Sequence, residues 1–178
     1  MSDDGRYYGK YRATVFSNVD PEGRGRIQAI VPDVLGITPS TYALPCLPVA
    51  GKQSGAFFVP EIGAGVWIEF EQGDPDYPIW SGCFWGSVAE LPPFAIASSS
   101  STPNMVLQTT GQNSVTVFGA PAMGVTLSAG PVGPSPSISV TPAAILIKCG
   151  AATISISAAG VDIIGAKITL NGTALVVT

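Results

Sequence analysis

Few side chains of this 178-residue chain suit catalysis or ligand binding, and most of them lie in its first half. The stretch "GDPD" at residues 73–76 places two carboxylates close together. Such a pair is suited to binding a cation or to supplying an acid and a base. Asp, Pro and Gly are also the residues that a tight turn requires, because the carboxylate caps the backbone and proline fixes φ. We interpret residues 73–76 as a turn.

Glu69 and Glu71, just before that turn, alternate with Val66, Ile68 and Phe70. This spacing places the apolar side chains on the inner face of a strand and the carboxylates on its outer face. A catalytic carboxylate needs a pKa raised by burial in a cleft, which an outer strand face does not provide. We therefore predict no catalytic residue, and consider Glu69 and Glu71 to face solvent or a partner protein.

Arg24 and Arg26 lie in the glycine-rich stretch "EGRGRI" at residues 22–27. Arginines beside such a turn could hold a phosphate group. The alternative, which we favour, is a basic hairpin tip that contacts an acidic partner or solvent. The formal net charge of −4 argues against nucleic acid as the partner, because nucleic-acid binding depends on a positive surface.

No metal or cofactor site is expected. The chain has no histidine, and Cys46, Cys83 and Cys149 lack CxxC spacing, which argues against common zinc sites and against Ser-His or Cys-His catalysis. A sparse, odd-numbered set of cysteines fits synthesis in the reducing cytoplasm. The polar start "MSDDGRYYGK" does not resemble a secretory signal peptide.

Charge divides the chain into two different parts. Of its 20 Asp, Glu, Lys and Arg residues, 17 lie in residues 1–90. Short alternating stretches between turns predict about five strands over residues 9–88, closed into a small barrel. Residues 1–8 form an arm before the barrel, and residues 89–103, with Pro-Pro and four consecutive serines, form a connector.

Residues 104–178 consist of short β segments punctuated by glycine, such as "SVTVF" and "TISIS". Their alternation puts aliphatic side chains on one face and small hydroxyl-bearing side chains on the other. A single chain has little to bury the aliphatic face against. We therefore predict that three copies wind into an intertwined homotrimeric β-helix needle, in which the aliphatic faces meet and the sheet edges pair. The predicted trimer core consists of Ile145, Ile147, Cys149, Ile154, Ile156, Val161, Ile163, Ile168 and Leu170.

The first half resembles the OB-fold domain of the central spike proteins of contractile injection machines. This family includes phage baseplate assembly protein V, the spikes of T4-like phages and the valine-glycine repeat spikes of type VI secretion. The shared pattern is P-x-x-G-x-x-V-x-V-x-F-x-x-G-D-P-x-x-P, followed by a strand that contains glycine. The second half resembles the trimeric β-helix of the family only in kind, since the eight-residue Val-Gly repeat is absent. The residues that carry the pattern are Pro60, Gly63, Val66, Ile68, Phe70, Gly73, Asp74, Pro75, Pro78 and Gly82.

The resemblance implies an all-β protein in which an OB-fold barrel precedes the homotrimeric needle. It implies a structural function without cofactor or enzymatic activity, as the puncturing tip of a phage tail or an extracellular phage tail-like particle. No hub-like or lysozyme-like domain is expected in this chain, so the barrel would dock on a separate tube or baseplate hub. Sheath contraction would then drive the needle through the target membrane.

Two docking regions follow from the resemblance. The hub-docking candidates are Arg24, Arg26, Glu69 and Glu71, because they are charged and predicted to be exposed. In this family a small conical tip protein of the PAAR type caps the needle. The apolar ending of the chain suits such a cap, although it could also complete the trimer core. The tip-docking candidates are Ala174, Leu175, Val176 and Val177.

Two other functions remain open from the sequence. One is a spike-associated cell-wall hydrolase, which the absence of histidine and of an inserted domain makes the weaker hypothesis. The other is a nucleic-acid-binding OB-fold protein with a low-complexity tail. Such proteins stack bases on exposed aromatic residues within a positive groove, and here the aromatic residues are present but few positive charges accompany them.

Overall fold

The computed structural model describes residues 5–97, 101–131, 135–170 and 175–177 of the chain. The chain folds into two compact units, Met1–Glu90 and Leu91–Thr178. Strands are the main elements of both units, and the helices are of three or four residues each. The fold is all-β, as the sequence predicts.

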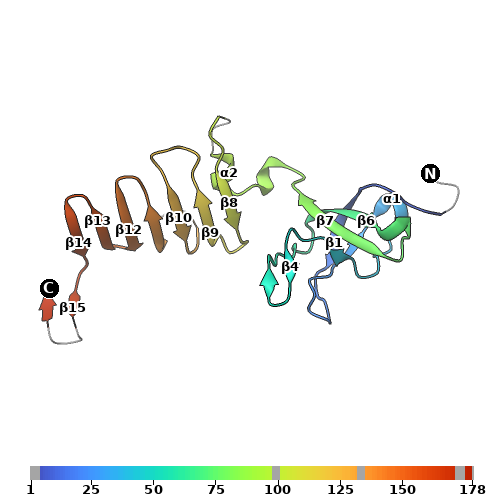
Figure 1. The fold of residues 1–178 in the computed structure, drawn as a ribbon, viewed down its shortest axis with the longest axis horizontal. Helices are drawn as coiled ribbons and strands as arrows, with labels where there is room; N and C mark the ends of the chain where they lie inside the picture. Colours follow the sequence, from blue (N-terminus) through green and yellow to red (C-terminus); the bar gives the residue numbers. More distant parts are fainter. Residues whose placement is uncertain (1–4, 98–100, 132–134, 171–174, 178) are drawn as a thin grey trace. The chain divides into compact units, whose positions relative to one another are not determined.

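The first unit contains a closed five-stranded barrel (Figure 1). Its strands pair in the order β2-β1-β6-β7-β3. Ile27 and Ala43 close the ring, because the Ile27 N–H donates to the Ala43 carbonyl at 3.2 Å and the Ala43 N–H donates back at 2.7 Å. The strands are β1 (Tyr11–Ser17), β2 (Gln28–Ile30), β3 (Leu44–Pro45), β6 (Gly65–Phe70) and β7 (Pro78–Phe84).

The barrel core forms because apolar side chains recur at every second position of these strands. Val66, Ile68 and Phe70 point inward, as their alternation predicts. Trp80 is also buried, and its indole N–H donates to the carbonyl of Gly25 at 3.1 Å. The buried hydrophobic residues are Ala13, Val15, Ile27, Ala29, Val31, Ala43, Val66, Ile68, Phe70 and Trp80.

Short elements connect the strands of the barrel. Helix α1 (Pro32–Leu35) follows β2, and the two-residue strands β4 (Ala50–Gly51) and β5 (Ser54–Gly55) form a hairpin. The 3-10 turn η1 (Glu71–Gly73) leads from β6 to β7, and η2 (Val88–Glu90) follows β7.

The second unit is built around a seven-stranded antiparallel sheet in which each strand pairs with its neighbours in sequence, in the order β14-β13-β12-β11-β10-β9-β8 (Figure 1). Helix α2 (Pro93–Ile96) precedes the sheet, and a separate two-stranded sheet follows it. The seven strands are β8 (Met105–Gln108), β9 (Ser114–Val117), β10 (Val125–Ser128), β11 (Ser137–Val140), β12 (Ala144–Cys149), β13 (Ala152–Ser157) and β14 (Gly160–Ile164). The second sheet pairs β15 (Ile168–Leu170) with β16 (Leu175–Val177).

The hydrogen-bond ladders of this sheet lie within one chain. Both edges of β9 to β13 are occupied by neighbouring strands of the same chain, and β8 and β14 form the edges of the sheet. The edge pairing that we expect between copies is thus already made within the chain for the five inner strands. The reason is local, since short connections keep successive strands side by side. Copies of the chain can still meet through the face of the sheet.

Candidate functional site

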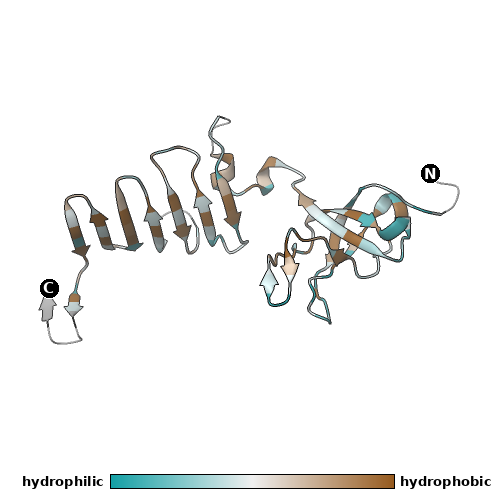
Figure 2. Ribbon diagram, in the orientation of Figure 1, coloured by the Kyte–Doolittle hydropathy of each residue, from teal (hydrophilic) through white to brown (hydrophobic). Residues whose placement is uncertain are grey.

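The candidate functional site is one face of the seven-stranded sheet. The register pairs apolar residues with apolar residues across every strand boundary, as in Ile138 with Ile147 and Ile145 with Ile156. Two continuous ladders result, and Figure 2 shows the hydrophobic bands alternating with paler ones along the strands. We call this set of fourteen side chains the apolar face: Met105, Leu107, Val115, Val117, Val125, Leu127, Ile138, Val140, Ile145, Ile147, Ile154, Ile156, Val161 and Ile163.

The apolar face is exposed in the single chain. The exposed fraction of its residues runs from 38% for Ile154 to 71% for Met105. Burying one such aliphatic side chain fully contributes about 1.5–3 kcal/mol. A contiguous apolar surface of this kind marks an interaction site, so the apolar face has the composition and the geometry of an interface.

The structure places the predicted trimer-core residues in three groups. Six of them belong to the apolar face: Ile145, Ile147, Ile154, Ile156, Val161 and Ile163. Cys149 lies at the end of β12, opposite Ala152. Ile168 and Leu170 belong to β15, outside the seven-stranded sheet, and Ile168 is half-buried there.

Sequence reasoning missed the part of the apolar face that precedes residue 145. The signal was present, because "SVTV" and "SISV" alternate in the same way as "TISIS". Alternation within a strand gives the two faces but not the register between strands. The register is what joins the eight further residues, from Met105 to Val140, to the six that were predicted.

The opposite face of the sheet carries mostly small hydroxyl-bearing side chains. The hydroxyls of Thr126 and Ser139 are hydrogen-bonded at 3.0 Å, and the Ser155 hydroxyl donates to Asp162 at 3.4 Å. Thr116 is buried, and its hydroxyl has no hydrogen-bond partner among the described residues. Hydrophilic side chains on this face leave the apolar face as the side suited to association.

The tip-docking candidates lie in or next to strand β16. Leu175, Val176 and Val177 form this strand, which pairs with β15 in the register Ile168 to Val177. Ala174 lies outside the described residues. The ending is therefore paired along one edge by β15.

Arg26, one of the hub-docking candidates, is a structural residue of the barrel. Its guanidinium donates to Asp20 through Nε at 3.0 Å and through Nη2 at 2.7 Å, and its side chain is only 12% exposed. It also lies over the ring of Tyr42, 4.8 Å from the centroid. We predicted a basic hairpin tip that contacts an acidic partner or solvent, and the structure differs in the exposure of Arg26, because Asp20 of the same chain holds its guanidinium.

Asp20 organises the whole turn that follows β1. Its carboxylate accepts from the backbone N–H groups of Glu22, Arg24 and Arg26 at 3.0, 2.8 and 3.2 Å, besides the guanidinium. The hydrogen bond from Arg26, with these backbone donors, holds the pKa of Asp20 well below its usual range. Backbone donors are already occupied by this carboxylate, which argues against a phosphate site at this turn.

The other hub-docking candidates differ in their surroundings. Arg24 is exposed and pairs with Glu22 at 2.6 Å. Glu69 on β6 pairs with Lys10 at 2.9 Å. Glu71 is exposed in η1. Arg24 follows the end of β1, and Glu71 lies beside the arm that precedes β1, so the structure does not bring the four candidates into one surface.

Residues 73–76 form a turn, as predicted. The Asp76 N–H donates to the Asp74 carboxylate at 3.0 Å, and the Tyr77 N–H donates to the Asp74 carbonyl at 3.0 Å. Within the described ranges, no group of three or more His, Cys, Asp or Glu residues is placed to hold a metal ion. The helices in the part of the chain that the structure describes are also too short to cross a membrane.

Two family models match the chain. Residues 11–85 match the type VI secretion system and phage-baseplate injector OB domain, and residues 104–177 match the phage baseplate V C-terminal trimerisation domain. The chain belongs to the baseplate assembly protein V family of phage spikes. Among curated proteins, none matches the chain significantly.

Membership of the baseplate V family gives the two units their roles. The barrel is the injector OB domain, and the seven-stranded sheet with its apolar face lies within the trimerisation domain. The protein is thus a structural baseplate component that forms a homotrimer and assembles into a phage tail particle. Both matched families are structural domains, consistent with a protein that is not an enzyme.

Proposed function

We propose that three copies of this chain form the puncturing spike of a contractile injection particle, docked on a separate tube or baseplate hub. The observation that carries the proposal is the apolar face. In a three-fold assembly each copy contributes one sheet as a wall, and the three apolar faces meet around the axis. Burial of fourteen aliphatic side chains per copy contributes on the order of 20 kcal/mol per chain, before the loss of freedom on association is subtracted.

Such a closed prism suits a spike that is driven forward under load. Each wall is already hydrogen-bonded along its full height, because the seven strands pair within one chain. Axial compression then acts on continuous hydrogen-bond ladders and on a dry core rather than on loops. The outer surface is hydroxyl-bearing, and Lys148 and Asp162 are the charged residues of these seven strands.

The β15–β16 hairpin is our candidate for binding a conical tip protein of the PAAR type. Its support is the position of an apolar strand, Leu175–Val177, beyond the seven-stranded sheet in sequence. One edge of β16 pairs with β15, and a partner would add to the remaining edge or to the side chains.

The piercing function is tested with intact particles that carry either the wild-type spike or a spike with Ile154→Asp and Ile156→Asp. We expect both particles to contract, and only the wild-type particles to depolarise target cells, measured with a potential-sensitive dye. A spike with Ser155→Asp and Ser157→Asp is the matched control on the opposite face. Depolarisation by particles that lack an ordered needle would show that the tube alone pierces the envelope.

A further inference from the structure

The barrel has two ends, which are formed by different segments of the chain. Strands β1 and β6 are antiparallel, with Tyr11 opposite Ile68 and Thr14 opposite Gly65, so the start of β1 and the end of β6 lie at the same end. Gly65 is also opposite Phe84, the last residue of β7, and the chain therefore leaves toward the connector from the other end. We call these the α1 end and the connector end.

Three segments that are distant in sequence meet at the α1 end: residues 6–8, residues 32–41 and residues 71–77. The Tyr7 N–H donates to the Gly73 carbonyl at 2.8 Å, and the Arg6 guanidinium donates to the Gln72 carbonyl at 2.7 Å. The Thr41 hydroxyl donates to the Asp76 carbonyl at 2.9 Å, which joins the segment after α1 to the same turn. Figure 1 shows α1 at this end of the barrel, with the hairpin of β4 at the other.

The α1 end exposes large apolar and aromatic side chains together with several carboxylates, which we call the acidic rim. Ile37 is 93% exposed, Tyr8 65% and Tyr77 62%. The carboxylates of this end outnumber its one basic group, the guanidinium of Arg6. A small hollow of about 260 Å³ lies between Arg6, Glu71, Gln72, Asp74 and Tyr77. The carboxylates of this end are Asp33, Glu71, Asp74 and Asp76.

Backbone hydrogen bonds close the turn that carries Tyr77. Glu71 and Tyr77 are joined by a backbone hydrogen bond of 2.9 Å, and Asp74 donates to the Glu71 carbonyl at 3.0 Å. Gln72 between them has a φ of 51°, a left-handed conformation that costs free energy for a residue other than glycine. A loop fixed in this way loses little conformational freedom on binding.

We propose that the α1 end is the surface that binds the hub, and that the hub offers an apolar groove bordered by basic side chains. The inference rests on the proposed docking of the barrel on a hub. Ile37 and Tyr77 are the apolar anchors, and Glu71 and Asp33 pair with the basic border. Buried anchors within a polar rim are the usual anatomy of a protein interface. The connector leaves from the other end, so this end is free of it.

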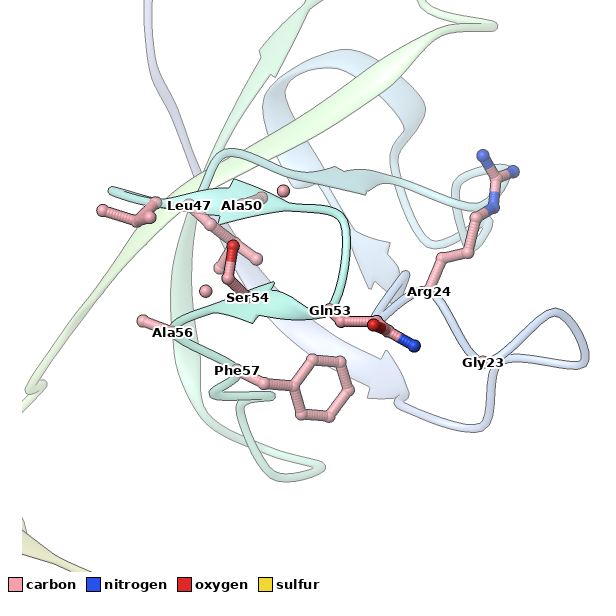
Figure 3. Close-up of a pocket in the computed structure, with 11 residues that line it drawn as sticks. Gly23, Arg24, Leu47, Ala50, Gln53, Ser54, Ala56 and Phe57 are labelled. Carbon is pink, nitrogen blue, oxygen red and sulfur yellow. The ribbon is translucent and has the colours of Figure 1, made fainter.

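The connector end carries charges of both signs and provides the control surface. There Arg24 and the β4–β5 hairpin enclose an open hollow of about 700 Å³ lined by Val49 and Phe57 (Figure 3). Lys52 lies between β4 and β5 and is exposed. Arg24, which we considered for hub docking from the sequence, thus lies at the connector end, where it pairs with Glu22.

The experiment uses the full-length trimer and the purified hub protein of the same particle, with binding measured by biolayer interferometry at low and at high salt. Ile37→Ser combined with Tyr77→Ala removes the anchors, and Glu71→Lys reverses a charge of the rim. The matched controls at the connector end are Val49→Ser combined with Phe57→Ala, and Lys52→Glu. All these side chains are exposed, and thermal melting of each variant verifies that the barrel is folded.

We expect both α1-end variants to weaken hub binding about tenfold or more and the controls to bind as the wild type does. Wild-type binding should also weaken as salt rises, since complementary charges are screened. Equal or greater loss in the controls would overturn the proposal and place the hub at the connector end. Loss of the trimer by sedimentation in the α1-end variants would assign this surface to a second copy. A wild-type trimer that does not bind the hub would instead refute the docking function itself.

Discussion

At the scale of single residues, the ion pair between Asp20 and Arg26 shows how one pair can stabilise a turn. The Asp20 carboxylate accepts five hydrogen bonds from the residues that follow it, and its side chain is 4% exposed. The exposed pair between Arg24 and Glu22 has a similar length but contributes little to stability, because solvent screens it. Burial and the number of donors, more than distance, decide which pair is structural.

The lowered pKa of Asp20 predicts that the barrel loses stability in acid. Since the folded state favours the ionised carboxylate, this contribution is fully present above about pH 4, the range of an unperturbed Asp. It is lost as the pH falls below that value toward the lowered pKa of the folded state. We expect Asp20→Asn to lower the melting temperature at neutral pH and to flatten its fall between about pH 4 and pH 2. Glu22→Gln is the control, and thermal melts at several pH values measure both.

Neighbouring residues of a needle strand point to opposite faces of the sheet, so substitutions at adjacent positions should have opposite effects on trimer formation. Ile154→Asp places a carboxylate on the apolar face, where three copies would bury three charges around one axis at a cost of several kcal/mol. Ser155→Asp adds the same group to the hydroxyl-bearing face and should be tolerated. Sedimentation equilibrium should give a monomer for the first variant and a trimer for the second. Equal damage from both would mean that the apolar face is not the trimer interface.

At the scale of secondary-structure elements, the turns determine how closely neighbouring strands of the second unit can approach one another. Gly124, which precedes β10, has a φ of 69°, and a Cβ at this position would overlap the carbonyl oxygen of Val140. Only glycine meets both conditions, because it lacks a Cβ and tolerates a positive φ. The same position lets β10 pair with β9 and with β11 in the registers that align the apolar face.

Gly124→Ala should therefore destabilise the needle and leave the barrel unchanged. A left-handed alanine costs about 1 kcal/mol per chain, and the overlap with the Val140 carbonyl adds to it. Gly111→Ala is the matched control, since its new Cβ would have ordinary contacts of 3.5 Å with Asn113. Calorimetry of the trimer should show a lower needle transition for Gly124→Ala alone. If both variants melt alike, the turn before β10 does not determine the register.

The whole molecule joins two units of different composition for two different tasks. The barrel carries most of the charge of the chain. The sheet carries its side chains as one aliphatic face and one hydroxyl-bearing face. Seven strands at a spacing of about 4.8 Å span roughly 30 Å, close to the hydrocarbon thickness of a bilayer, which is about 30 Å. A needle of this height therefore matches the membrane that the spike is proposed to cross.

The proposed tip site makes a prediction for the whole particle. Deleting residues 173–178 removes strand β16 but leaves the seven-stranded sheet intact, so the trimer should keep its mass in sedimentation and nearly all its thermal stability. Binding of the tip protein encoded by the same particle should be lost in a pull-down with purified components. A deletion that dissolves the trimer, while the tip protein still binds what remains, would assign these residues to the trimer core.

The sequence by itself determined the strand-bearing segments, the turn at residues 73–76 and the two faces of each strand. These features depend on local rules, since alternation fixes facing and the Asp-Pro chemistry fixes a turn. Only the tertiary structure decided that the apolar face begins at Met105, because register between strands is not encoded in any one of them. It also decided that Arg26 is paired with Asp20 and that Arg24 and Glu71 lie at opposite ends of the barrel. The sequence does not show which way a charged side chain points, because that depends on how the strands around it pair. In a closed barrel this pairing joins residues that are far apart in the chain.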